Sequence, residues 1–136
     1  MKKMLLIEDD DLVANMLSLM LSKSEFEVAH ASTEQEAVAK FSEAQNSRKP
    51  FDLVVVDLIL GEDNQAGAKA MKRIRAIQPG VVSILCTGFV QSPVVENFNE
   101  HGFDFCLSKP FSWQNLKVIL AEKFEIQPPQ LGKPNN

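Results

Sequence analysis

The sequence of 136 residues has no tyrosine and only two cysteines, Cys86 and Cys106. Both cysteines lie within apolar segments and show no metal-ligand spacing, so the sequence favours neither a zinc site nor a disulfide framework. We expect them to be buried thiols in a reducing compartment. A small, secreted, disulfide-bonded domain is therefore disfavoured.

The chain also lacks a long apolar run and an excess of positive charge. Its first apolar stretch, residues 4–7, ends at Glu8 and is too short for a signal peptide or a membrane span. The net charge is −4, from 14 Lys and Arg against 18 Asp and Glu, and there is no basic stripe, so direct nucleic-acid binding is not expected. Neither G-x-x-x-x-G-K nor G-x-G-x-x-G occurs, which disfavours a nucleotide-binding protein. We expect a soluble, cytoplasmic protein without a membrane partner.

Short apolar runs alternate with helix-period segments along the chain, which is typical of repeated strand-helix units and a parallel sheet in an α/β domain. The strands are expected at about residues 3–7, 27–31, 52–56, 81–86 and 104–107. The fourth helix, expected over about 93–100, has a thin apolar face and should be the least firmly packed. One domain is expected over 1–125, followed by a disordered tail or linker stub, rich in proline, over 126–136.

Polar side chains follow four of the expected strands. They are the acidic cluster that begins with Glu8 and Asp9, then Asp57, Thr87 and Lys109. Ligands of an open parallel sheet bind at the carboxyl ends of its strands, so we expect these groups to meet despite their separation in sequence.

The residue types in this set suit phosphoryl transfer to a carboxylate. Asp57 can attack phosphorus if the charge on the phosphoryl oxygens is neutralised. Glu8 and Asp9, together with Asp57, form the oxygen-rich, negative environment that Mg²⁺ prefers. The Lys109 ammonium and the Thr87 hydroxyl can each bind a phosphoryl oxygen.

Each of these residues also has a plainer interpretation. A single Asp after an apolar strand is more often a turn or cap residue, and Asp10 and Asp11 are better interpreted as caps of the first helix. Thr87 fits a turn hydroxyl, and Lys109 fits a solvated loop charge. The plain interpretation fails for the set, because four unrelated accidents would have to fall at one edge of the sheet.

Four blocks of sequence, in this order and spacing, resemble the receiver domains of two-component response regulators, the CheY-like family. The blocks are residues 6–10, 52–57, 84–88 and 102–111, and the resemblance covers about 3–124. It implies a doubly wound, flavodoxin-like sheet of five parallel strands in the order 2-1-3-4-5, with helices on both faces. It also implies Mg²⁺-dependent phosphorylation of Asp57 by the phosphohistidine of a sensor histidine kinase or a histidine phosphotransfer protein.

The resemblance carries further expectations for single residues. The backbone carbonyl of Ile59 would be another Mg²⁺ ligand, and the peptide between Lys109 and Pro110 would be cis. Thr87 and Phe105 would form the switch that changes the face made by the fourth helix, fifth strand and fifth helix, although Phe105 fits core packing equally well. The domain would catalyse only its own phosphorylation and dephosphorylation. The resemblance also allows a homodimer that forms on phosphorylation.

The chain departs from the family pattern after Asp57. Gly61 stands where the family usually has proline, and Gly67 comes about two residues late, so the loop should be longer and more mobile. Two alternatives stay open: a haloacid-dehalogenase-like Mg²⁺-dependent phosphatase, and a pseudo-receiver that only binds partners. The first would need an acid-base Asp where the chain has Ile59, and the complete set from Glu8 to Lys109 argues against the second.

Overall fold

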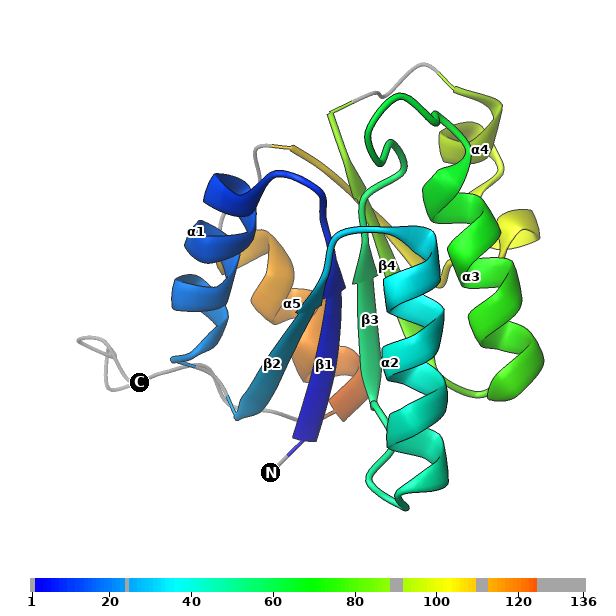
Figure 1. Ribbon diagram of the computed structural model, residues 1–136. Coiled ribbons are helices and arrows are strands. Elements are labelled where there is room, and N and C mark those ends of the chain that lie inside the picture. The colour runs from blue at the N-terminus through cyan, green and yellow to red at the C-terminus, as the bar shows by residue number, and fades with distance from the viewer. Residues whose placement is uncertain (1, 24, 89–91, 110–112, 125–136) are drawn as a thin grey trace.

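A computed structural model describes residues 2–23, 25–88, 92–109 and 113–124 of the chain (Figure 1). Strands and helices alternate as the sequence predicts. The strands are β1 (Lys2–Ile7), β2 (Phe26–Ala31), β3 (Leu53–Val56), β4 (Val82–Thr87) and β5 (Phe105–Ser108). The helices are α1 (Asp11–Leu21), α2 (Glu34–Asn46), α3 (Ala66–Ile77), α4 (Pro93–Glu96) and α5 (Trp113–Phe124), with a 3-10 helix, η1 (Phe98–His101), after α4. The tail expected over 126–136 lies outside the described residues.

All five strands are parallel, in the order β2-β1-β3-β4-β5, which confirms the expected doubly wound sheet. The chain winds in opposite directions from β1 to β2 and from β1 to β3, and a crevice forms at the carboxyl ends where the order reverses. Ile7 pairs with Val56, so the residues that follow β1 and β3 are neighbours. Thr87 pairs with Ser108, which brings the ends of β4 and β5 together.

Helices cover both faces of the sheet. Figure 1 shows α1 and α5 on one face and α2, α3 and α4 on the other. Each face has its own apolar core, and every side chain of β3 is buried between them. A central parallel strand must be apolar on both faces, which explains the unbroken run in β3. Among the described residues, none of the helices has the length and apolar character that a membrane crossing requires.

Both cysteines are free thiols, as expected. Cys86 is buried in β4, and burial raises the pKa of its thiol to about 12. Cys106 is half-buried in β5, and burial raises its pKa as well. At neutral pH both therefore pack as small apolar side chains.

Side-chain caps begin the first two helices, and the cap of α1 lies where the sequence predicts. The Asp10 carboxylate accepts hydrogen bonds from the backbone of Leu12 at 2.9 Å and of Val13 at 3.2 Å, so Asp10 caps α1. The Thr33 hydroxyl accepts one from the backbone of Glu36 at 3.1 Å and caps α2. The cap interpretation of Asp10 is thus confirmed, and this carboxylate is already bound to the helix.

The fourth helix is shorter than the sequence predicts. It ends at Glu96 instead of about residue 100, because Asn97 leaves the helical conformation with φ −124° and ψ 43°, and η1 follows. Val94 is the buried residue of α4, and the half-buried Val95 and Phe98 pack at the edge of the core. So little apolar contact does not hold a longer α-helix in place, since helices of this length depend on packing.

Candidate functional site

The strand ends bring the predicted metal ligands and phosphoryl-binding groups into one cavity of about 370 Å³. It lies at the carboxyl edge of the sheet, on the side where β1, β3 and β4 are adjacent. The residues that line it are Glu8, Asp9, Asp10, Val13, Asp57, Ile59, Thr87, Gly88 and Lys109. The expected meeting of an acid pair, a carboxylate, a hydroxyl and an ammonium is therefore present.

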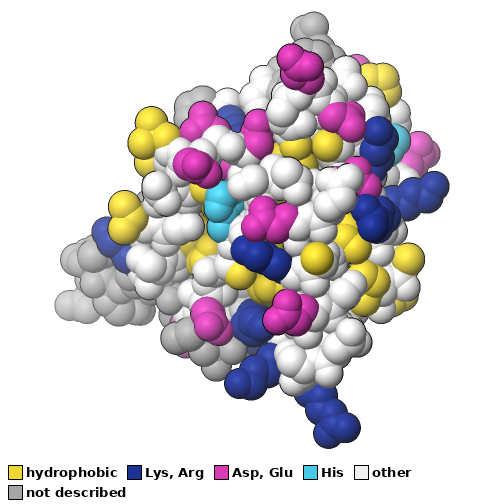
Figure 2. Space-filling model, viewed as in Figure 1, with side chains coloured by type: hydrophobic (Ala, Val, Ile, Leu, Met, Phe, Trp, Pro, Cys, Tyr) yellow, Lys and Arg dark blue, Asp and Glu magenta, His cyan; other side chains and the backbone are white. Residues whose placement is uncertain are grey.

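Three carboxylates form the acidic part of the cavity. Glu8 is buried, Asp57 is half-buried and Asp9 is exposed, and oxygens of the three lie within 4.8 Å of one another. The Asp9 side chain is anchored to the loop after β3, because its Oδ2 accepts a hydrogen bond from the backbone of Gly61 at 2.8 Å. This set of hard oxygen donors fits Mg²⁺. Figure 2 shows many acidic side chains in the upper part of the molecule, over the carboxyl ends of the strands.

Lys109 links two of these carboxylates. Its Nζ donates a hydrogen bond to Glu8 Oε1 and another to Asp57 Oδ2, the latter at 3.1 Å. Its backbone donates to the Thr87 carbonyl at 2.9 Å, which fixes the end of β5 against the end of β4. Burial by itself lowers the pKa of Lys109, but the bond to Glu8 and the charge of Asp57 outweigh burial and raise it. Lys109 is therefore a charged ammonium beside Asp57 at neutral pH.

Glu8 is the most buried of the three acids. Burial raises the pKa of this carboxyl, the charge of Asp57 raises it further, and the hydrogen bond from Lys109 opposes both. Its Oε2 also accepts from the backbone of Asp10 at 3.2 Å. Three carboxylates against one ammonium leave an excess of negative charge, which a divalent cation at this site would neutralise.

The backbone of Asp57 is held on two sides. Its N–H donates to the Ile7 carbonyl at 2.9 Å, and the next residue, Leu58, accepts from the backbone of Gly67 at 2.9 Å. A Cβ on Gly67 would lie 2.1 Å from the Asp57 carbonyl oxygen and 2.8 Å from Leu58 Cα. Only glycine lets the first turn of α3 approach Asp57 so closely. The sequence marked Gly67 as a late glycine and gave no sign of this contact.

The loop between Asp57 and α3 is closed by its own hydrogen bonds. The backbone groups of Leu60 and Asp63 bond reciprocally at 3.2 and 3.3 Å, and Gly61 between them has φ +67°. This left-handed conformation explains a glycine where the family usually has proline. Ile59 lines the cavity with an apolar side chain, half-buried against the core.

The two proposed switch residues lie on neighbouring strands. Thr87 is buried at the end of β4, and Phe105 is half-buried in β5, where it packs with the core shared by α1 and α5. Lys123 Nζ lies 5.7 Å from the centre of the Phe105 ring. The core interpretation of Phe105 thus has contacts in this structure, and its switch role stays a prediction. Pro110, and with it the expected cis peptide, lies outside the described residues.

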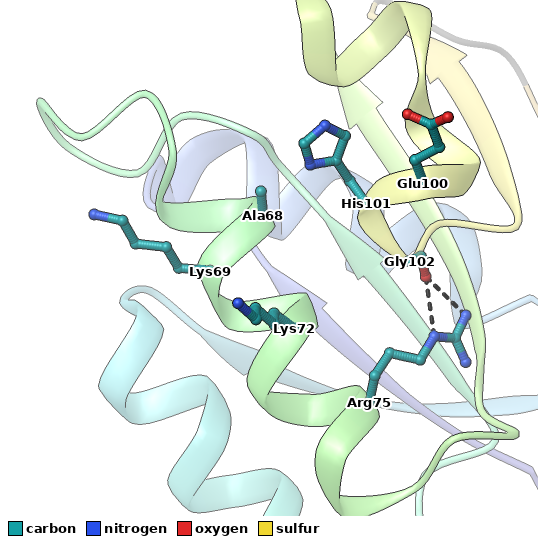
Figure 3. Close-up of a pocket in the computed structure, with 7 residues that line it drawn as sticks. All are labelled: Ala68, Lys69, Lys72, Arg75, Glu100, His101 and Gly102. Carbon is teal, nitrogen blue, oxygen red and sulfur yellow. Dashed lines mark hydrogen bonds between the residues drawn. The ribbon is translucent and has the colours of Figure 1, made fainter.

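A second cavity, of about 420 Å³, lies between α3 and η1, away from the acidic site at Asp57 (Figure 3). Arg75 lines this cavity, and the Nε and Nη2 of Arg75 donate hydrogen bonds to the Gly102 carbonyl at 3.0 and 2.8 Å. The same guanidinium bonds Asp104 at 3.0 Å and the Pro79 carbonyl at 2.8 Å. Lys69 points away from η1 and pairs with Asp63 at 3.0 Å. The Arg75 guanidinium is therefore already hydrogen-bonded within the protein. We interpret this cavity as part of the seam along which α3 packs against η1.

Residues 4–121 match the family model of the response regulator receiver domain. Chemotaxis protein CheY from Thermotoga maritima is 32% identical over 121 residues, which cover 88% of this chain and 93% of CheY. Transcription factor SKN7 from Chaetomium thermophilum is 30% identical over 118 residues, which cover 87% of this chain. The chain spans only 15% of the length of SKN7.

Solved structures agree with these relatives. The receiver domain of sensor histidine kinase PA1611 from Pseudomonas aeruginosa PAO1, which has a magnesium ion coordinated in its active-site cleft, is 26% identical to this chain. The two superpose with a TM-score of 0.74, covering 89% of this chain and 95% of that one. With the fold, the cavity and these matches together, the chain belongs to the response regulator receiver domain family of two-component signalling.

Proposed function

We propose that this receiver takes a phosphoryl group onto Asp57 in a Mg²⁺-dependent reaction. The donor would be the phosphohistidine of a histidine kinase or of a histidine phosphotransfer protein. The observation that carries the proposal is the position of Lys109, whose ammonium bonds both Glu8 and Asp57 in the cavity that holds the acid cluster. The family match and the magnesium ion in the PA1611 receiver support it.

The reaction needs a nucleophile and neutralisation of charge. An Asp57 oxygen forms the new bond to phosphorus, and the phosphorus–nitrogen bond breaks with its electron pair going to the departing imidazole. Lys109, already 3.1 Å from Asp57 Oδ2, would move its ammonium to a phosphoryl oxygen, and the Thr87 hydroxyl would bind another.

Glu8, Asp9 and Asp57 would hold the metal, and by analogy with the family the Ile59 carbonyl would join them. Bound Mg²⁺ supplies charge neutralisation for the phosphoryl oxygens. The Ile59 side chain in the cavity cannot move a proton, so no acid-base group stands at the position that a haloacid-dehalogenase-like phosphatase would use. We therefore expect the domain to act as a signalling receiver that catalyses only its own phosphorylation and dephosphorylation.

Mass spectrometry after incubation with acetyl phosphate and Mg²⁺ tests the nucleophile. The wild-type chain should gain about 80 Da, the mass of one phosphoryl group, and Asp57→Asn should not. Equal labelling of the Asn variant would place the nucleophile elsewhere and overturn the proposal.

The metal ligands are tested with a matched pair of neighbouring acids. Asp9→Asn removes an oxygen donor of the cluster, whereas Asp10→Asn changes a carboxylate that is already bound to the start of α1. Calorimetry should show about tenfold weaker Mg²⁺ binding for Asp9→Asn and little change for Asp10→Asn. Equal losses would contradict the assignment.

We also propose that the donor protein docks on the outer face of α1. Leu12, Met16 and Leu19 are 71, 61 and 70% exposed, at the spacing of one helical stripe. The helix starts at the rim of the cavity, which Val13 lines, and Figure 2 shows hydrophobic side chains on this side of the molecule. A protein that presents its phosphohistidine to Asp57 must cover this rim, and an exposed apolar stripe there suits a partner helix.

The docking face can be tested separately from the phosphoryl-transfer reaction, because a small donor such as acetyl phosphate does not need a docking surface. Replacing Leu12 and Met16 by Ser should slow phosphorylation by a purified histidine kinase that labels the wild type, while labelling by acetyl phosphate stays unchanged. Val118→Ser on α5 changes an equally exposed apolar residue, at 64%, and serves as the control. If the double variant and the control are phosphorylated by the kinase at the same rate, the partner binds elsewhere.

A further inference from the structure

We infer that His30 is a positioning residue for the metal ligands, an inference that rests on the proposed function. The imidazole Nε2 of His30 lies 2.6 Å from the backbone carbonyl oxygen of Glu8. A carbonyl oxygen can only accept, so Nε2 carries a proton and donates it. His30 lies on β2, an edge strand, and nothing in the sequence pattern connects it with the acid cluster.

This hydrogen bond acts on the peptide unit that joins the two metal-binding acids. The Glu8 carbonyl and the Asp9 N–H belong to one planar group, so fixing the carbonyl direction also fixes how the chain enters Asp9. The Glu8 N–H is held too, because it donates to the Ala31 carbonyl at 3.0 Å. The end of β2 thus binds the backbone on both sides of Glu8, just where β1 gives way to the acidic loop.

His30 is itself held by α2. Its carbonyl accepts a hydrogen bond from Lys40 Nζ, and Lys40 pairs with Glu36 at 3.4 Å. Glu36 in turn accepts from the backbone of Ser32 at 2.7 Å. A connected set of bonds therefore runs from α2 through His30 to the Glu8–Asp9 peptide. Asp9, the exposed acid, depends most on it, because among the described bonds its side chain is anchored only by the backbone N–H of Gly61.

A purely structural role would make a different prediction. If His30 only strengthened the edge of the sheet, its loss would lower the unfolding temperature and leave the Mg²⁺ affinity of the folded protein unchanged. If His30 orients the Glu8–Asp9 peptide, metal affinity falls even where the protein is fully folded. Mutation of a residue that hydrogen-bonds a metal ligand commonly lowers the metal affinity by about 10- to 100-fold.

The test compares four variants of the whole chain by calorimetric titration with Mg²⁺. His30→Leu has no donor, and the hydroxyl of His30→Thr lies one bond from Cβ, well short of the position of Nε2. Both residues are compatible with a strand, and one variant suffices if the other fails to fold. His30→Gln keeps an amide N–H at about the reach of Nε2. His101→Leu removes the other histidine of the chain, which lies on η1, and is the matched control.

We expect about tenfold weaker Mg²⁺ binding for the Leu and Thr variants and near-normal binding for His30→Gln and His101→Leu. The Leu and Thr variants should also need about tenfold more Mg²⁺ for half-maximal phosphorylation by acetyl phosphate and reach the wild-type rate at saturation. Unchanged Mg²⁺ affinity in these variants, with a wild type that binds Mg²⁺ and is phosphorylated, overturns the role of His30 alone. A wild type that binds no Mg²⁺ overturns the proposed function and this inference together.

Discussion

Helix α3 runs for 12 residues and buries five of them, whereas α4, on the same face of the sheet, has four residues and buries only Val94. The start of α3 rests against the backbone of Asp57 through Gly67. The segment formed by α4 and η1 packs on the core through Val94, Val95 and Phe98. It is tied to α3 mainly through Arg75, which bonds the Gly102 carbonyl.

The difference separates the part of the receiver that holds Asp57 from a segment that could change its arrangement when Asp57 is phosphorylated. An element with few buried contacts opens at a low free-energy cost, and two of its arrangements can lie close in energy. The segment of α4 and η1 runs between Thr87 and β5, next to the groups that would bind the phosphoryl oxygens. A phosphoryl group that binds one arrangement better would shift this segment, and we propose that the face of α4, β5 and α5 is then the output surface.

The largest effect is expected from placing a side chain into the close contact between α3 and Asp57. Gly67→Ala would place a Cβ 2.1 Å from a backbone oxygen, and a backbone cannot move aside as a side chain can. The free energy of unfolding should fall by about 3 kcal/mol, and phosphorylation should slow as Asp57 is displaced. Denaturant titration measures the first effect. Gly80→Ala, where no atom lies within 4 Å of the new Cβ, is the control, and equal stabilities would refute the contact.

An intermediate effect is expected from loosening the seam between α3 and η1. Arg75→Lys keeps the charge but loses the fork that bonds Gly102 and Asp104 together. We expect a loss of about 2 kcal/mol, from hydrogen bonds to a charged group. Arg73→Lys changes a more exposed ion pair with Glu34 and should cost about 0.5 kcal/mol or less. Similar losses of stability in denaturant titrations of the two variants would show that Arg75 does not hold η1 against α3 more strongly than an ordinary surface ion pair.

The smallest effect should come from α4 itself. Val94→Ala should lower the global free energy of unfolding by only about 1 kcal/mol, although Val94 is as buried as core residues of α3. The loss is limited because a weakened α4 opens locally before the domain unfolds. Ile74→Ala in α3 has no such limit and should cost about 3 kcal/mol. Comparable losses in the two variants would mean that α4 is held as firmly as α3.

The sequence predicted the sheet and the composition of the site because both depend on local patterns. Apolar runs that end in Glu8, Asp57, Thr87 and before Lys109 define strands and their polar ends. Parallel topology alone then brings those ends to one edge. Asp10 could likewise be identified as a cap, since capping depends on residues two and three positions away.

The contacts between elements could not be predicted in this way. The bonds from His30 to Glu8 and from Arg75 to Gly102 join residues 22 and 27 positions apart, and no periodicity relates such pairs. Gly67 is visible in the sequence only as a glycine, because its importance depends on how close α3 comes to Asp57. The early end of α4 at Glu96 is also decided by weak tertiary packing and not by a helix stop signal.

Hydrogen exchange of the free protein and of the Mg²⁺–beryllofluoride form, which imitates a phosphoryl group on Asp57, tests the central comparison most directly. We predict that protection changes most between Gly88 and Lys109, the part of the chain that includes α4, η1 and β5, while α3 exchanges alike in both forms. The opposite result would be equal protection of that part in both forms, with changes confined to the loop between Asp57 and α3. It would contradict the assignment of α4 and η1 as the responding segment.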